Sequence, residues 1–171
     1  MPYTLPPPAL EDATYRRHRR WMMRALELAE TAGEAGDVPV GAVVVGPQDR
    51  LLAEAANRRE QDQDPTAHAE ILALRQASHR LGRWRLNQCT LYVTLEPCPM
   101  CAGALGLSRL GLLVYGADDP KAGAVRSCLN LPASACSNHH LPVLAGILAD
   151  PCRQQLQIWF QNRRQAGHPS T

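Results

Sequence analysis

Long hydrophobic runs are missing from this sequence of 171 residues. No apolar stretch approaches the roughly 20 residues that cross a bilayer, so we expect no membrane partner. Residues 1–10 lack the basic-then-apolar order of a signal peptide, which makes the cytoplasm the expected compartment. Internal repeats and low-complexity segments are also absent, which excludes repeat architectures.

The chain also lacks a large excess of charge. Its formal net charge of +2 indicates no particular partner. Arginines do cluster locally near the start, at positions 16, 17, 19, 20 and 24, and near the end, at positions 163 and 164. Such clusters can track phosphates, but a solvated helix face explains them equally simply, and composition alone favours the second interpretation.

The length indicates one domain rather than two. A chain of this size buries about 70% of its unfolded surface, which is enough for a hydrophobic core. We expect residues 1–12 to form a disordered N-terminal arm, residues 13–165 to fold as one domain, and residues 166–171 to be a flexible tail.

Cysteine is present at six positions, namely 89, 98, 101, 128, 136 and 152. An even count can indicate disulfides, but that reading suits small secreted chains, and this chain is neither. Cys98 and Cys101 form a C-x-x-C pair. We interpret the other four cysteines as small hydrophobic residues.

Apolar and β-branched patterns predict an α/β architecture. The expected strands cover residues 38–45, 51–57, 89–95, 110–115 and 141–147. The expected helices cover residues 13–35, 99–107 and 150–164, and one more begins at Asp64-Pro65, with aspartate as N-cap and proline in the first turn. A weakly patterned stretch up to Asn138 has room for one short helix. A hairpin turn at residues 46–49 makes the five-stranded sheet mixed rather than parallel.

Two short motifs carry the chemistry, and each sits at the start of an expected helix after a strand. His68-Ala69-Glu70 is one, and Pro97-Cys98-Pro99-Met100-Cys101 is the other. Two thiolates and one imidazole suit tetrahedral zinc, and three protein ligands leave the fourth position open, as in catalytic sites. Zinc lowers the pKa of bound water, so the reaction also needs a proton shuttle, for which Glu70 is the candidate. Because residues i and i+2 diverge on a helix, His68 and Glu70 can serve one site only if the helix meets it end-on.

Each part of this constellation has an ordinary alternative. A histidine at a helix start is usually a cap or core residue, a C-x-x-C pair is often redox-active or half of a structural zinc site, and a first-turn glutamate complements the helix dipole. Taken jointly, H-x-E followed by P-C-x-x-C matches the signature of the zinc nucleobase deaminases.

Beyond these motifs, the sequence resembles the bacterial tRNA-specific adenosine deaminase (TadA) family of the cytidine and deoxycytidylate deaminase superfamily, over roughly residues 15–165. The likeness is carried by segments 37–43, 64–70, 90–98, 100–104, 115–117 and 146–150, and by Asn57, Asp119, Lys121 and Gly123. The resemblance implies a cytidine-deaminase-like three-layer α/β/α sandwich, with residues 13–165 as the zinc-dependent deaminase domain. It also implies a homodimer with one zinc ion per subunit. The implied reaction hydrolyses a C–N bond of a cyclic amidine, converting the wobble adenosine of a tRNA anticodon to inosine with release of ammonia.

The resemblance assigns roles to individual residues. His68, Cys98 and Cys101 match the zinc ligands, and Glu70 matches the catalytic carboxylate. Asn57 matches the residue that hydrogen-bonds the flipped base. Asp119 and Lys121 match a loop that approaches the anticodon, and Phe160 and Arg163 stand where the C-terminal helix of the family nears the RNA.

Three other interpretations compete with this one. Residues 158–164 resemble the recognition helix of a homeodomain, but strands and prolines occupy the place of the two helices that must precede it, so we expect no DNA partner. A deaminase of free guanine, cytosine or cytidine would share the zinc motif, and so remains open from the residues alone. A purely structural zinc or redox module also remains open.

Overall fold

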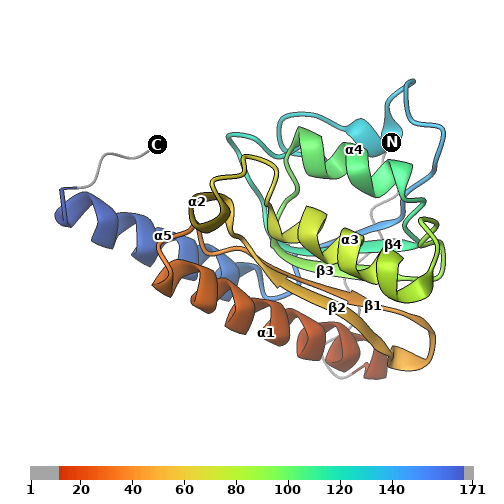
Figure 1. Cartoon of the computed structure of the whole chain (residues 1–171), viewed down its shortest axis with the longest axis horizontal. Coiled ribbons are helices and arrows are strands. Elements are labelled where there is room, and N and C mark those ends of the chain that lie inside the picture. Colours follow the sequence, from red (N-terminus) through yellow and green to blue (C-terminus); the bar gives the residue numbers. More distant parts are fainter. Residues whose placement is uncertain (1–11, 168–171) are drawn as a thin grey trace.

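A mixed five-stranded sheet forms the middle layer, in the order β2-β1-β3-β4-β5 (Figure 1). This computed structural model describes residues 12–167. Strand β1 (Gly41–Val45) pairs antiparallel with both β2 (Leu51–Ala56) and β3 (Thr90–Leu95), whereas β3, β4 (Leu112–Ala117) and β5 (Val143–Ala145) run parallel. The predicted mixed sheet is therefore confirmed.

Two helices cover each face of the sheet, which confirms the predicted α/β/α sandwich. Helices α1 (Ala13–Glu34) and α5 (Ala149–Gln165) lie on one face, and α3 (Ala69–Leu81) and α4 (Pro99–Leu107) lie on the other (Figure 1). Alternation along β1 supplies both cores, since Val43 and Val45 face α1 while Ala42 and Val44 face α3.

Helix α1 packs unusually close to β1 because small residues meet at the contact. Ala25 and Ala29 are fully buried there. Gly41 faces them, and a Cβ atom at Gly41 would lie 2.0 Å from the Ala25 carbonyl oxygen. Only glycine therefore fits at the start of β1.

Several predicted boundaries were wrong. The first strand begins at Gly41 rather than residue 38, the fourth covers 112–117 rather than 110–115, and the last covers only Val143–Ala145. Asp64 does not cap a helix; its carboxylate accepts hydrogen bonds from Thr66 N at 2.8 Å and Thr66 Oγ1 at 2.7 Å, and so closes a turn. Helix α3 begins only at Ala69.

Three short elements complete the chain. A 3-10 turn, η1 (Pro47–Asp49), joins β1 to β2 at the predicted hairpin turn. The short helix expected before Asn138 is η2 (Leu131–Ala133). Helix α2 (Arg59–Asp62), directly after β2, was not predicted.

The cysteines are all free, so no disulfide framework forms. Cys89 and Cys152 are buried as expected of small hydrophobic residues. The same interpretation was wrong for Cys128 and Cys136, which are exposed on the segment between β4 and β5.

Three of the five clustered arginines on α1 prove to be paired with carboxylates. Arg17 Nε donates to Asp49 at 2.7 Å, Arg20 also donates to Asp49, and Arg24 Nε donates to Glu54 at 2.5 Å. These contacts hold α1 on the β1–β2 hairpin. Val45 of that hairpin pairs with Thr90, the first residue of β3. The cluster therefore lies at the end of the sheet opposite the C-x-x-C pair, which follows the last residue of β3.

The predicted arm and tail lie outside the described residues, apart from Asp12, Ala166 and Gly167. Asp12 is the N-cap of α1, where its carboxylate accepts from Thr14 N at 2.8 Å. No helix within residues 12–167 is long and apolar enough to cross a membrane.

Replacing Asp49 by alanine is expected to lower the free energy of unfolding by about 1–2 kcal/mol, because Arg17, Arg20 and Trp21 lose their shared acceptor. Partial burial raises the pKa of Asp49, but hydrogen bonds from Trp21 and Arg17 outweigh it and hold the pKa below its ordinary value. The stabilisation is thus present at neutral pH and lost as the pH falls through that lowered value.

Urea unfolding of the wild type and of Asp49→Ala at about pH 7 and about pH 3 measures the free energy of unfolding. The difference in this free energy between the two proteins should be smaller at about pH 3. The control is Asp49→Asn, which keeps an acceptor for Trp21 and tolerates the left-handed backbone there (φ 63°). A difference that is the same at both pH values would contradict the assignment.

Candidate metal centre

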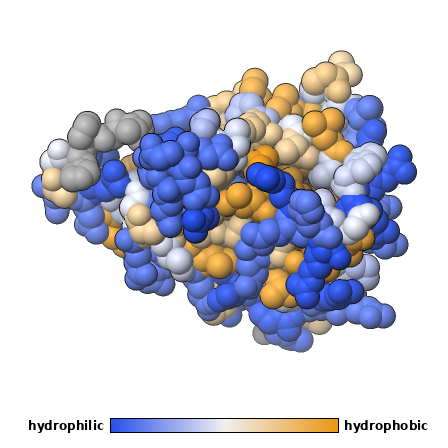
Figure 2. All heavy atoms as spheres, viewed as in Figure 1, coloured by the Kyte–Doolittle hydropathy of each residue, from blue (hydrophilic) through white to orange (hydrophobic). Residues whose placement is uncertain are grey.

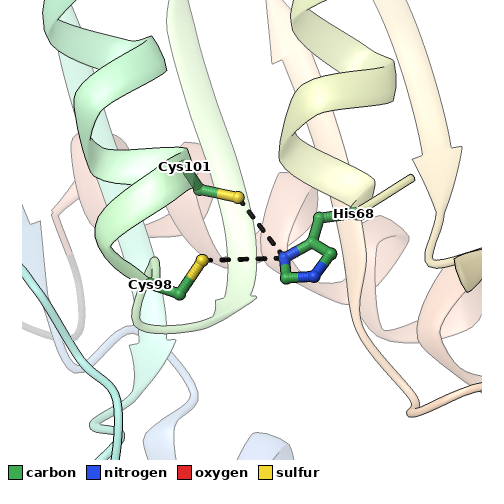
Figure 3. A group of neighbouring side chains, drawn as sticks. All are labelled: His68, Cys98 and Cys101. Atoms are coloured by element: carbon green, nitrogen blue, oxygen red, sulfur yellow. Dashed lines mark hydrogen bonds between the residues drawn. The ribbon is translucent and has the colours of Figure 1, made fainter. Parts of the chain in front are cut away.

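Helices α3 and α4 lie side by side, and both begin at the carboxyl edge of the parallel strands (Figure 3). A potential metal ligand precedes each helix. His68 is the N-cap of α3 and Cys98 is the N-cap of α4, both with extended backbone. The usual N-cap residues are serine, threonine, aspartate and asparagine, which bond their own helix. Neither His68 nor Cys98 makes such a bond. Their side chains are therefore free to point at each other.

The three donor atoms lie at the spacing of a tetrahedral metal site. His68 Nδ1 is 3.7 Å from Cys98 Sγ and 3.5 Å from Cys101 Sγ, and all three atoms lie within 4.8 Å of one another. Zinc bonds of about 2.0–2.1 Å to nitrogen and 2.3 Å to sulfur, at the tetrahedral angle, place those two atoms about 3.6 Å apart. The residues present therefore fit a zinc ion with one coordination position left over.

The three ligand groups share protons through hydrogen bonds with one another. Hydrogen bonds from Cys101 and His68 lower the pKa of Cys98 to about 4, so this sulfur is a thiolate at neutral pH. The same bond to Cys98, together with burial, raises the pKa of Cys101, and the bond to Cys98 raises the pKa of His68. A divalent cation bound here would displace the shared protons, as metal binding at such sites does.

Glu70 lies in the first turn of α3, beside the ligands. It is buried, and burial raises the pKa of its carboxyl group. A carboxyl group with a raised pKa can both take and release a proton near neutrality. His68 and Glu70 line the same cavity, so the end-on arrangement expected from their spacing is present even though the helix starts later than predicted.

The cavity at these helix ends has a volume of about 180 Å³. Its wall consists of Val38, Val40, Asn57, Arg59, His68, Glu70, Leu95, Glu96, Cys98, Asp119 and Ala122. Ligand pockets for drug-sized molecules are usually about 300–1,000 Å³. The smaller volume suits one planar ring system. Asn57, buried directly after β2, supplies an amide to this wall.

The other residues singled out from the sequence lie at different distances from the cavity. Asp119 is part of the wall. Lys121 is exposed beside it, and its backbone N–H donates to Asp119 Oδ1 at 2.9 Å, but it does not line the cavity.

Phe160 and Arg163 lie on α5, which covers the opposite face of the sheet from α3 and α4. Arg163 Nη1 donates to the Gly36 carbonyl at 2.8 Å, and its guanidinium group stacks 4.8 Å from the ring centre of Trp159. Trp159 Nε1 donates to the Gly33 carbonyl at 3.1 Å, and Phe160 packs edge-on against Trp159. In the structure these residues fasten α5 to the end of α1, and none of them lines the cavity.

Sequence reasoning missed Glu96, a carboxylate that organises the cavity. Oε1 accepts from the backbone N–H groups of Val125, Arg126 and Ser127 at 2.7–3.1 Å, and Oε2 accepts from Asp119 N at 3.0 Å and from the Ser127 hydroxyl. Burial raises the pKa of Glu96, but these hydrogen bonds outweigh it and keep the pKa low. Gly123 sits against this carboxylate, since a Cβ there would lie 2.4 Å from it. The sequence held one signal for this role: Glu96 is an isolated acidic residue at the end of an apolar strand, two residues before Cys98.

Asp37 is a second carboxylate whose role was missed. It is fully buried, and it accepts from Glu60 N at 2.8 Å, Gln61 N at 3.2 Å and the Gln61 side chain at 3.1 Å. Asp37 thus caps α2, whose own N-cap residue makes no side-chain bond. Arg59, the first residue of α2, and Asn57, two residues before it, both line the cavity. By capping α2, Asp37 therefore fixes that side of the cavity wall.

Comparison with known proteins gives a consistent result. The profile of the MafB19-like deaminases matches residues 16–155. The chain is similar to the tRNA-specific adenosine deaminase of Haemophilus influenzae, at 48% identity over 145 residues, which are 84% of each protein. It is also similar to a structure solved in a study of A-to-I editing by tRNA:A34 deaminases at the wobble position of transfer RNA. That similarity has a TM-score of 0.77 and 42% identity, over 80% of this chain and 98% of that chain. The guanine deaminase of Bacillus subtilis is less similar, with a TM-score of 0.57 and 31% identity over 84% and 94% of the chains.

Replacing Glu96 by glutamine is expected to lower the free energy of unfolding by about 2–4 kcal/mol, because the new amide group would face N–H donors that need an acceptor. Residues 119–127 should also exchange their amide hydrogens faster, while the metal content stays the same because all three ligands are kept. Hydrogen exchange with mass spectrometry and elemental analysis measure these effects.

The matched control for Glu96→Gln is Asp118→Asn, which removes the same charge from an exposed carboxylate that pairs with Arg126. It should cost about 1 kcal/mol or less. Equal exchange rates in Glu96→Gln and the wild type would refute the assigned role of Glu96.

Proposed function

The chain belongs to the family of tRNA-specific adenosine deaminases, and from this premise we propose that it hydrolyses the wobble adenosine of a tRNA anticodon to inosine at a zinc ion. One observation carries the proposal: two members of a His-Cys-Cys ligand set, His68 and Cys98, line one cavity of the size of a single base together with a buried carboxyl group and a buried amide. As a hydrolysis, the reaction breaks the bond between C6 of adenine and its exocyclic amino nitrogen, and it forms a C6–O bond.

We assign zinc to His68 Nδ1, Cys98 Sγ and Cys101 Sγ because their spacing and donor chemistry fit that ion. When bound, zinc supplies the Lewis acidity that activates a water molecule for attack on carbon. The backbone N–H groups at the starts of α3 and α4, which no N-cap side chain binds, add positive potential where negative charge develops on oxygen.

Glu70 is the proton carrier in this proposal. Its carboxylate takes one proton from the attacking water and delivers it to the adenine ring nitrogen. It then takes the second proton from the hydroxyl group formed on C6 and delivers it to the amino group, which leaves as ammonia while the C6–O bond becomes a carbonyl. Burial raises the pKa of Glu70, which favours its protonated form and so the proton-delivering half of this cycle. Its place in the first turn of α3 keeps it next to the ligands without making it one.

Asn57 is the residue that holds the base. An asparagine amide offers one acceptor and two donors, which match the edge of a purine. The cavity has room for the base only after the nucleotide leaves its stack, which costs less in a single-stranded anticodon loop than in a duplex. We assign Asp119 and Lys121, at the edge of the cavity, to the neighbouring nucleotides, and Phe160 and Arg163 on α5 to more distant RNA contacts.

Helix α4 supports the further proposal of a homodimer. It contains no charged residue, and a helix that is apolar all round is normally buried all round. Nevertheless Leu107 is 77% exposed and Met100 is 36% exposed, and Gly103 has open space where a Cβ would stand. Figure 2 shows apolar residues gathered over this part of the surface between hydrophilic ones. We propose that a second copy packs on α4. Because the substrate is tRNA, we also propose a cytoplasmic location.

The decisive assay compares inosine formation and ammonia release on tRNA, on an anticodon stem-loop, and on free adenosine, guanine and cytosine. We expect deamination of both RNA substrates at the wobble adenosine and at least about a hundredfold lower kcat/KM on the free compounds, since these lose the binding energy of the flanking nucleotides. Activity on free guanine or cytosine with none on RNA would overturn the proposal in favour of a free-base deaminase.

Two variants separate the roles of the ligands and the carboxylate. Glu70→Ala should keep zinc and the fold but lower kcat by about 10²–10⁴-fold, the usual contribution of a general acid–base. Cys98→Ala should lose zinc and activity together. Elemental analysis, thermal unfolding and kcat measure these effects, and Cys136→Ala, an exposed cysteine outside the site, is the control. A fully active Glu70→Ala enzyme would show that another group moves the proton.

A further inference from the structure

The segment that follows the first turn of α3 contains positively charged residues but no negatively charged ones. Residues 71–95 contain no aspartate or glutamate, but they contain four arginines, all exposed, at positions 75, 80, 83 and 85. Within residues 12–167, none of these four forms an ion pair with a carboxylate. We call these four arginines, together with Trp84 among them, the basic strip.

The basic strip differs in this respect from the arginines of α1. There Arg17, Arg20 and Arg24 are neutralised by Asp49, Glu54 and Glu27. The α1 cluster is denser in sequence, but three of its arginines are paired with carboxylates, whereas no ion pair forms at the basic strip within residues 12–167. Uncompensated arginines beside a groove attract polyanions.

Trp84 adds a flat apolar surface to this field. Its side chain is 55% exposed, and the Arg85 guanidinium group lies 4.8 Å from the ring centre. An exposed tryptophan beside arginine is the combination that stacks on unpaired bases and binds the adjoining phosphates in single-stranded RNA. A protein partner would place acids opposite these arginines, but RNA also explains the aromatic ring.

A groove of about 680 Å³ connects the basic strip to the catalytic end of the molecule. It begins at Ile71 and Ala104, which lie three residues after the ligands His68 and Cys101, and it ends at Trp84. Arg75 and Arg83 line it on the α3 side. At about 1.5 Å per residue, Arg75 lies about 10 Å and the end of α3 about 20 Å from His68, a length that spans several phosphates.

We propose that the basic strip binds the backbone of the RNA strand that continues from the target adenosine, with Arg75 and Arg83 on phosphates and Trp84 stacked on an unpaired base. The RNA follows the α3 side of the groove, whereas the α4 side, which includes Leu107, belongs to the face proposed for the second copy. This interaction rests on the proposed tRNA substrate and adds the path that the substrate takes across the protein. It makes the basic strip a determinant of RNA affinity rather than of the chemical step.

The test is the double variant Arg75→Ala/Arg83→Ala. Binding of a fluorescent anticodon stem-loop is measured between about 50 and 200 mM KCl, and wobble inosine formation gives kcat and KM. We expect Kd and KM to rise about tenfold at physiological salt, the slope of log affinity against log salt to fall by about 1.4, and kcat to stay within about twofold. The lysine variant Arg75→Lys/Arg83→Lys keeps both charges and should retain most of the slope.

The matched control is Arg17→Ala/Arg20→Ala, which removes two arginines from the neutralised cluster on α1. It should leave Kd, KM and the salt slope unchanged. An unchanged Kd and slope in the double alanine variant would overturn the proposal, and so would an equal loss in the α1 control. A change from dimer to monomer with loss of kcat, measured by light scattering, would instead assign the groove to the second copy. A wild type that binds the stem-loop but forms no inosine would refute the proposed function, not the basic strip.

Discussion

The arrangement of the site depends on one constraint, which is that the two residues in N-cap position do not cap their helices. His68 and Cys98 leave the first N–H groups of α3 and α4 unsatisfied by their own side chains. Those groups and the ligand atoms therefore all face the same small space at the carboxyl edge of β3. A cation, a developing negative charge and a carboxylate can occupy that space together because both helix dipoles favour the anions and the ligands hold the cation.

Two buried carboxylates keep the walls of this space in place. Glu96 holds the segment from Asp119 to Ser127, and Asp37 holds helix α2. Each accepts several N–H donors, which is the condition under which a buried charge is tolerated. The α5 contacts with Gly33 and Gly36 reach the chain just before Asp37, so the helix on the far face is joined by main-chain contacts to the wall of the cavity.

Sequence patterns predicted most of the fold, because α1 has apolar residues at helical spacing and the strands are short apolar runs. They also placed His68 with Glu70 and Cys98 with Cys101 at the starts of two helices, since each of these two motifs is local. They failed where one residue type suits two local structures: Asp64 is typical of an N-cap but instead closes a turn with Thr66. They also failed where hydrogen bonds between distant segments decide the structure. The arginines near the start were interpreted as a solvated helix face, but Arg17, Arg20 and Arg24 pair with acids more than 25 residues away. The roles of Asp37 and Glu96 were missed because their partners, mostly backbone N–H groups, lie more than 20 residues away in the sequence.

The partners of Glu96 have one more consequence. Four of the groups that it binds are main-chain N–H groups, at Asp119, Val125, Arg126 and Ser127, and main-chain N–H groups are the same whatever the side chain. Gly123 is fixed by the close approach of the carboxylate, but most other side chains of this segment can mutate without loosening its backbone. Such a loop can evolve at its tip while the metal site beneath it stays constant, so new substrates can be acquired on an unchanged scaffold.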